Sequence, residues 1–143
     1  MKVTFKLVDH GSEEWKSAVQ LREAILRKPL GSRFTDEELK EEKSHIQIIG
    51  LLDTEIVATS VLVPENQSMK MQRVVVKDEL RNSGIGSEMM LFCEKISREN
   101  GKYSIFCHAR DTAVNFYLNN NYRIEGEYFP EDGIPHVKMV KQI

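Results

Sequence analysis

The sequence has few cysteines, no metal-ligand motif and no long apolar run, and each absence removes a class of protein. Its two cysteines, Cys93 and Cys107, lie in separate apolar segments without a CxxC pairing, which favours buried, reduced thiols over a disulfide or a redox pair. The four histidines form neither an HExxH motif nor a Cys/His cluster, so we expect no metal. No uncharged apolar run approaches the roughly 20 residues that span a bilayer, so we expect no membrane partner.

An excess of charge of one sign is also absent. Twenty Lys and Arg residues stand against 22 Asp and Glu residues, which gives a formal net charge of -2. General binding to nucleic acid needs a basic surface that neutralises phosphates, so we expect no nucleic-acid partner. The first ten residues alternate apolar and polar side chains, unlike a signal peptide, and this pattern predicts a cytoplasmic protein.

The composition that remains is that of an ordinary globular protein. Hydrophobic residues make up 41% of the chain and charged residues 29%, which excludes fibrous and disordered classes. A length of 143 residues suits one domain, residues 1–143, and is too short for two ordinary ones.

Residue periodicity predicts a mixed α/β fold. Helices are expected at about residues 12–28, 35–43, 84–99 and 111–120, and strands at about 2–8, 46–52, 55–63, 69–77, 103–108, 122–128 and 135–140. Two of these strands flank the short polar turn Asp53-Thr54 and form a hairpin, and a loop containing Pro64 and Asn66 follows it. One strand-helix-strand crossover among hairpins indicates a mixed sheet, not an all-parallel one.

The segment from Val74 to Gly86 carries the clearest chemical signal. A strand with the centre Val74-Val75-Val76 runs through a polar turn into a helix whose start contains Gly84 and Gly86. The start of a helix offers free backbone N–H groups and the positive end of the helix dipole, and glycines let a phosphate approach the main chain. We therefore predict an anion-binding site here, to which Arg81 adds a fixed charge.

Two common phosphate-binding motifs do not fit this segment. The Walker loop requires GxxxxGK[ST], which is absent. The dinucleotide fingerprint requires GxGxxG at the head of a βαβ unit, but Met89 occupies the third glycine position and the strand follows a hairpin. The pattern Arg-x-x-Gly-x-Gly, in contrast, matches residues 81–86 completely.

Together with residues 113–122, this pattern makes the sequence resemble the GCN5-related N-acetyltransferase (GNAT) family. That family has an Arg/Gln-x-x-Gly-x-Gly/Ala turn after its fourth strand and, further along, a helix of the form Ala-x-x-Phe-Tyr-x-x-x-Gly-Phe. The second motif here reads Ala113-Val114-Asn115-Phe116-Tyr117-Leu118-Asn119-Asn120-Asn121-Tyr122. Asn121 replaces the usual glycine, and asparagine is the next best residue for a left-handed helix cap. The ending at residues 133–139 also looks like the last strand of many small bacterial members.

The resemblance implies a single-domain acyl-CoA N-acyltransferase fold with about seven mostly antiparallel strands and four helices. It implies an enzyme that moves the acetyl group of acetyl-CoA to an amine by direct attack through a tetrahedral intermediate, without a metal. The expected acceptor is a small-molecule amine or an amino acid-like compound, and a homodimer stays open. Two alternatives also stay open: a protein or peptide N-acetyltransferase, and a catalytically silent CoA-binding regulatory module.

The resemblance also places the cofactor contacts. The fourth-strand backbone would stabilise the oxyanion, and the glycine turn would hold the pyrophosphate. Arg110 stands where many relatives have an asparagine that contacts the pantetheine region, which puts one contact in doubt. The expected cofactor-binding residues are Val74, Val75, Val76, Arg81, Asn82, Ser83, Gly84, Ile85, Gly86 and Arg110.

For the proton transfers, the resemblance makes Tyr117 the acid that protonates the departing thiolate. The base is not assigned, because residues 71–73 offer no carboxylate where many relatives carry a glutamate. His136, a neutral imidazole near pH 7, is the first candidate, His108 is the second, and water is the third.

Three arginines lie around the first two predicted helices, which form the acceptor side in relatives. Arg22, Arg27 and Arg33 are candidates to meet a carboxylate of the acceptor. A solvated helix face is the more favoured interpretation of each one.

Overall fold

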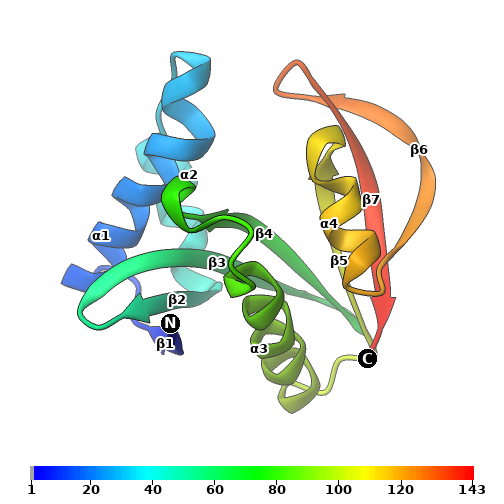
Figure 1. Ribbon diagram of the computed structural model, residues 1–143, viewed down its shortest axis with the longest axis horizontal. Helices are drawn as coiled ribbons and strands as arrows, with labels where there is room; N and C mark the ends of the chain where they lie inside the picture. Colours follow the sequence, from blue (N-terminus) through cyan, green and yellow to red (C-terminus); the bar gives the residue numbers. More distant parts are fainter. Residues whose placement is uncertain (1) are drawn as a thin grey trace.

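A computed structural model describes residues 2–143 as a seven-stranded sheet with helices on both faces (Figure 1). The strands run in the order β1-β2-β3-β4-β5-β7-β6, and only β4 and β5 are parallel. The predicted mixed sheet with seven mostly antiparallel strands and four helices is confirmed. The strands are β1 (Thr4–Val8), β2 (Ile46–Leu52), β3 (Glu55–Glu65), β4 (Ser68–Val76), β5 (Ser104–Arg110), β6 (Arg123–Glu131) and β7 (Ile134–Gln142); the helices are α1 (Glu13–Arg22), α2 (Asp36–Glu41), α3 (Ile85–Glu99) and α4 (Val114–Asn119).

The first helical segment begins as the sequence predicts and changes form before it ends. The hydroxyl of Ser12 caps α1 by accepting a hydrogen bond from the Trp15 backbone N–H. The chain then continues through a π-helical turn, Glu23–Arg27, and a 3-10 turn, Lys28–Leu30. A π turn widens the helix and often lies at a functional site. Among the residues that the structure describes, no helix has the length and apolar character needed to cross a membrane.

The loop between β3 and β4 is shorter than the sequence predicts. Pro64 lies inside β3 and pairs with Met69 of β4, so only a tight turn at residues 66–67 separates the two strands. Proline cannot donate a hydrogen bond to a neighbouring strand, which made it appear to end the strand. It is tolerated because β2 pairs with β3 only as far as Leu62, so β3 has no strand on that side at Pro64.

The centre of the sheet opens where β4 and β5 separate. The two strands pair only between Ser68–Lys70 and Ser104–Phe106, and β4 has no β5 partner beyond Lys70 among the described residues. Figure 1 shows the two strands diverging from this point. A β-bulge enhances the opening, because the register of β3 and β4 shifts and Arg73 adopts a positive φ of 54°. One edge of residues 71–76 therefore keeps its backbone groups unpaired in the middle of the molecule.

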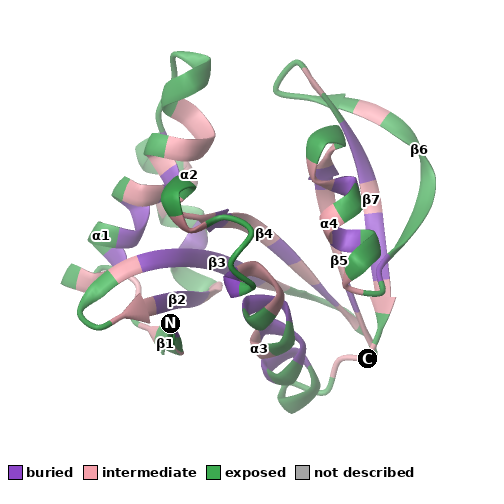
Figure 2. Cartoon of the chain, in the orientation of Figure 1, coloured by how far each residue is buried: buried purple, intermediate pink, exposed green. Residues whose placement is uncertain are grey.

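The main core lies between the sheet and α3. Met89, Met90 and Cys93 of α3 are fully buried against the inner strands (Figure 2). Both cysteines are free and buried, as the sequence predicts. Burial raises the pKa of the Cys93 and Cys107 thiols to about 12, so neither is a nucleophile at neutral pH.

Candidate functional site

The turn that precedes α3 has the geometry of an anion site. Gly84 is the N-cap of α3 with a positive φ of 87°, and no side chain caps the helix. A Cβ atom built on Gly84 would meet no atom within 4 Å, so the space in front of the helix is open. The first N–H groups of a helix have no partner inside it. This 15-residue helix therefore offers backbone donors and the positive end of its dipole to a phosphate.

The other residues of this turn shape and charge it. The Ser83 hydroxyl donates to the Leu80 carbonyl and thereby folds the turn back on itself. Asn82 adopts a positive φ of 64°, which asparagine tolerates better than most residues. Arg81 Nη2 lies 2.9 Å from Asp78 Oδ1, and both side chains are more than half exposed. Because an exposed ion pair is weak, a bound anion can compete for Arg81.

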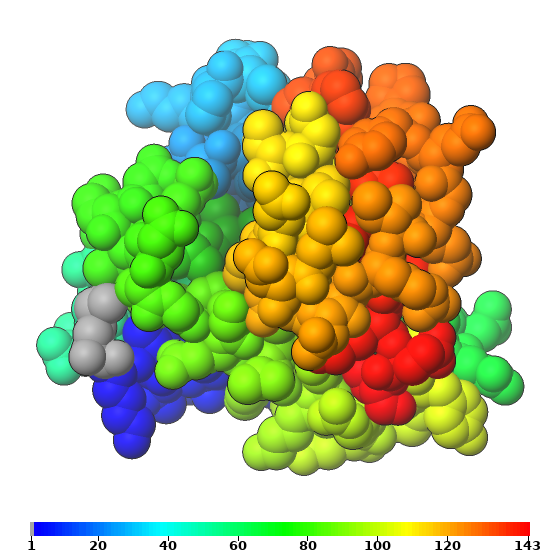
Figure 3. Space-filling model, turned by 45° about the vertical axis from the view of Figure 1, so that its right-hand side comes forward, coloured from blue at the N-terminus to red at the C-terminus, as the bar shows by residue number. Residues whose placement is uncertain are grey.

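The two sequence motifs meet in space at Gly86. A Cβ atom on Gly86 would lie 2.9 Å from the Phe116 ring, so the starts of α3 and α4 touch. Figure 3 shows α4 on the same face of the molecule as the segment that leads into α3. Gly86 therefore allows α3 and α4 to pack closely, whereas Gly84 allows the backbone turn and leaves the space before α3 open.

Tyr117 lies in the core of this junction. It is 5% exposed, and its ring packs edge-on against Phe116 and Tyr122 at centroid distances of 5.0 and 5.5 Å. Burial raises the pKa of Tyr117 well above its ordinary value, and the neighbouring Cys107 thiol adds to the rise. The hydroxyl is therefore held in its protonated form.

The other face of β5 carries a second set of polar groups. Phe106, His108 and Arg110 alternate with the buried Cys107 and Ala109, so they face away from α4. Arg110 Nη2 donates to the Leu26 carbonyl of the π turn, 3.2 Å away. The structure thus directs Arg110 to the side of the sheet that carries α1.

His136 and His108 share one carboxylate on this face. Glu131 Oε1 lies 3.2 Å from His108 Nδ1, and Glu131 Oε2 lies 3.5 Å from His136 Nε2. The sequence singled out both histidines but not Glu131. The sequence held one signal for it, because Glu131 lies between the last two predicted strands, a few residues before His136, and adjacent antiparallel strands bring such residues together.

A charged cluster joins α1, α2 and the β4 bulge. Arg22 is fully buried with Nη1 2.9 Å from Glu42 Oε1, and Arg73 Nε lies 3.3 Å from Glu42 Oε2. Arg27 and Glu38 form a bidentate pair with distances of 3.0 and 2.5 Å. The favoured prediction of a solvated helix face is therefore wrong for Arg22, which lies in a buried ion pair and exposes no surface to a substrate. Arg73 ties the bulge to α2, a link the sequence did not reveal.

We expect the Glu38 pair to make stability depend on pH. The Arg27 hydrogen bond, more than any other contact, lowers the pKa of Glu38 from 4.5 to about 2. A lowered folded pKa stabilises the fold above the unfolded value, so this contribution is complete above pH 4.5 and is lost as the pH falls toward 2. Since Glu38 is partly exposed, Glu38→Gln should lower the free energy of unfolding by about 1 to 2 kcal/mol at pH 7 and by less at pH 3.

Urea denaturation of both proteins at the two pH values measures this difference. Glu37→Gln is the matched control, since Glu37 is an exposed neighbour in the same helical turn. Equal losses for the two variants at pH 7 would contradict the role of the Arg27 pair.

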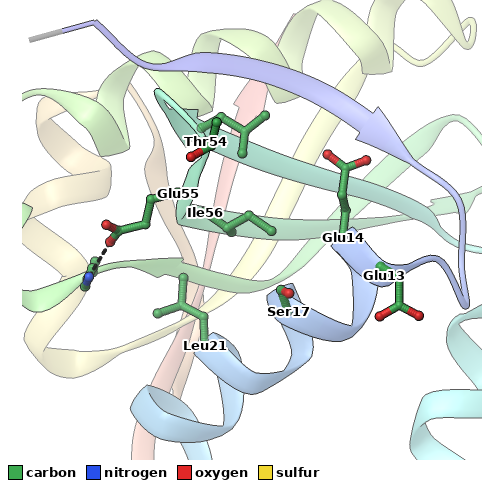
Figure 4. A pocket seen from close by; sticks show the side chains of 9 residues that line it. Glu13, Glu14, Ser17, Leu21, Thr54, Glu55 and Ile56 are labelled. Carbon is green, nitrogen blue, oxygen red and sulfur yellow. Dashed lines mark hydrogen bonds and ion pairs between the residues drawn. The ribbon is translucent and has the colours of Figure 1, made fainter.

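A surface hollow lies elsewhere. It has a volume of about 470 Å³ between α1 and the β2–β3 turn, with Leu21 and Ile56 toward its floor and Glu13, Glu14 and Glu55 at its rim (Figure 4). Glu55 pairs with Lys77 there. None of the predicted cofactor-binding or catalytic residues lines this hollow. The residues predicted for the site therefore lie apart from this hollow.

A mixed sheet that opens between two parallel strands, with an uncapped helix start beside the opening, defines an acyl-CoA N-acyltransferase fold. Comparisons with known proteins agree. The family model described as an acetyltransferase (GNAT) domain matches residues 12–143. The chain therefore belongs to the GNAT family and is an acetyltransferase, as the sequence motifs predict.

Three individual similarities illustrate this. The uncharacterized N-acetyltransferase YjcF of Bacillus subtilis is 28% identical over 138 residues, which cover 94% of this chain and 97% of YjcF. The crystal structure of Escherichia coli ElaA superposes with a TM-score of 0.83 at 20% identity, covering 98% of this chain and 99% of ElaA. An aminoglycoside 6'-N-acetyltransferase complexed with coenzyme A gives a TM-score of 0.81 at 16% identity, with 97% and 96% coverage. The last two show the shared fold.

Proposed function

We propose that this protein transfers the acetyl group of acetyl-CoA to the amine of a small molecule or an amino acid-like acceptor. One observation carries the proposal: the uncapped start of α3 lies beside the unpaired edge of β4, and α4, which carries Tyr117, touches that helix start through Phe116. The structural neighbour crystallised with coenzyme A supports a CoA-based donor for this shared fold.

Each part of the opening has a chemical task. The backbone N–H groups from Asn82 to Gly86, with Arg81, would hold the pyrophosphate. Unpaired backbone groups of Val74–Val76 would polarise the thioester carbonyl and stabilise the developing oxyanion. Tyr117 would donate its proton to the departing thiolate, and Arg110 stays a proposed cofactor contact. The base would be His136 of β7, His108 of β5 or water.

One contact favours a small acceptor over a peptide. Arg110 joins the end of β5 to the Leu26 carbonyl of the π turn, 3.2 Å away. This contact bridges the acceptor side at the end of β5, whereas a peptide would need an open groove along this side.

Thiol release from acetyl-CoA across a panel of primary amines, amino acids and short peptides tests the proposal. We expect turnover with at least one small amine and far slower turnover with every peptide. Efficient turnover only with peptides would contradict the acceptor class. Binding of acetyl-CoA without turnover on any member of the panel would support the regulatory module instead.

A further inference from the structure

The cluster of His108, Glu131 and His136 supplies what β4 lacks, a carboxylate coupled to a base. These three residues come from β5, β6 and β7, and they converge on the acceptor side of the sheet. Register pairing explains the convergence: His136 lies opposite Arg110 on β5 and opposite Phe129 on β6. The fold, not the sequence spacing, brings them together.

The two histidines are held in different ways. His136 Nδ1 lies 2.7 Å from the Ile134 carbonyl, which can only accept, so Nδ1 carries the proton. Its other nitrogen faces Glu131, and its side chain is only 6% exposed. Both nitrogens of His136 are therefore directed at protein groups, which leaves neither open to an acceptor.

His108 has one nitrogen bound and one open. Its Nδ1 lies 3.2 Å from Glu131 Oε1, while no hydrogen bond or ion pair engages Nε2 within residues 2–143. The side chain is 29% exposed, and Phe129 packs edge-on against its ring at 5.0 Å. A carboxylate on Nδ1 fixes the tautomer that leaves a lone pair on Nε2 and stabilises the imidazolium that forms when Nε2 takes a proton.

We propose that His108 is the general base of this acetyltransferase and that Glu131 is its positioning residue. This inference rests on the proposed function. It assigns the base to the second candidate from the sequence, because the first candidate has no open nitrogen. The location also fits, since β5 borders the opening where the thioester carbonyl would lie.

The proton balance of the transfer is complete with these groups. An ammonium acceptor carries two protons that the amide product lacks. His108 Nε2 takes one and releases it to water. The C–N bond then forms and the thioester C–S bond breaks, and the second proton replaces the one that Tyr117 gives to the CoA sulfur. No oxidant, metal or further reactant is needed.

Other charged groups near His108 also affect how kcat/KM depends on pH. Glu131 and His136 face it from β6 and β7, and Lys138 is its direct register partner on β7. Arg110 lies two residues further along β5 on the same face. Lys138 itself pairs with Glu125 Oε1 at 3.6 Å. Glu125→Gln is therefore a matched control, because it removes a carboxylate from the same strand without touching either histidine.

The pH profile of kcat/KM with an accepted amine tests the assignment. We expect His108→Gln to lower kcat/KM about 100-fold or more near neutral pH and to remove the acid limb of the profile. Glu131→Gln should lower kcat/KM about 3- to 10-fold, because a neutral amide stabilises the imidazolium formed during the transfer less than a carboxylate does. Glu125→Gln should leave both kcat/KM and the limb unchanged, and His136→Gln should keep the limb despite a moderate loss of rate.

Two outcomes would overturn the assignment: a limb that vanishes in His136→Gln but persists in His108→Gln, or one that persists in both. Histidine ¹⁵N NMR of the free protein tests it without any acceptor. We expect neutral His108 to carry its proton on Nδ1, and the proton on Nε2 would overturn the proposal. Absence of turnover in the wild type, combined with the expected tautomer, would instead count against the proposed function alone.

Discussion

Tyr117→Phe should lower kcat by about 10- to 1000-fold and leave the affinity for acetyl-CoA nearly unchanged. In the proposed mechanism the hydroxyl acts only when the thiolate leaves, so its loss would remove an interaction made in the transition state. The ring remains and continues to pack between Phe116 and Tyr122, which keeps the core intact. Steady-state kinetics together with calorimetric titration of acetyl-CoA separates the two effects.

Tyr122→Phe is the control for this variant. Tyr122 belongs to the same buried aromatic group, but its hydroxyl donates to Glu94 Oε2 at 2.9 Å. Loss of that bond should cost about 1 to 3 kcal/mol of stability and leave kcat within about threefold. If Tyr117→Phe turned over as fast as the wild type with every accepted amine, the acid would have to be another group.

Gly84→Val should abolish the stabilisation that acetyl-CoA gives the folded protein. In the wild type, acetyl-CoA at about 100 times its Kd should add about 2.7 kcal/mol, which corresponds to a rise in Tm of about 5 to 10 °C. Valine at a φ of 87° is strained, and its branched side chain would fill the open space before the helix. Thermal unfolding with and without acetyl-CoA measures the change.

Gly101→Val separates strain from obstruction. Gly101 follows the C-terminal end of α3 and has a φ of 75°, and a Cβ atom built on it would meet no atom within 4 Å. Valine at this position therefore has the same backbone strain as valine at position 84. It should lower the Tm of the free protein and retain the acetyl-CoA shift. A folded Gly84→Val protein that kept the full shift would remove the phosphate assignment.

Local patterns in the sequence were sufficient for most of the fold. The Ser12 and Thr35 caps and the apolar face of residues 85–99 produced helices where expected, because each signal acts within a few residues. Pro64 led to the wrong prediction of a loop, because whether β3 can contain a proline depends on how far β2 extends beside it. That is a property of the sheet and not of the local sequence.

The motif of the turn before α3 could also be recognised from neighbouring residues, but the contacts among the candidate acid-base groups could not. Arg81, Gly84 and Gly86 lie within six residues, so their motif was visible in the chain itself. The pairing of Glu131 with His108 joins residues 23 positions apart, and the link from Arg73 to Glu42 joins residues 31 positions apart. Neither contact has a sequence signature, because strand register and the β4 bulge create them.

Product analysis with isotopically labelled acetyl-CoA and the best amine of the panel tests the central claim most directly. The account predicts a labelled amide of the amine, formed in an amount equal to the CoA released, as measured by mass spectrometry. It also predicts that Gly84→Val and Tyr117→Phe form this amide far more slowly than the wild type. Release of CoA with labelled acetate in place of the amide, or bound acetyl-CoA that no amine discharges, would contradict it.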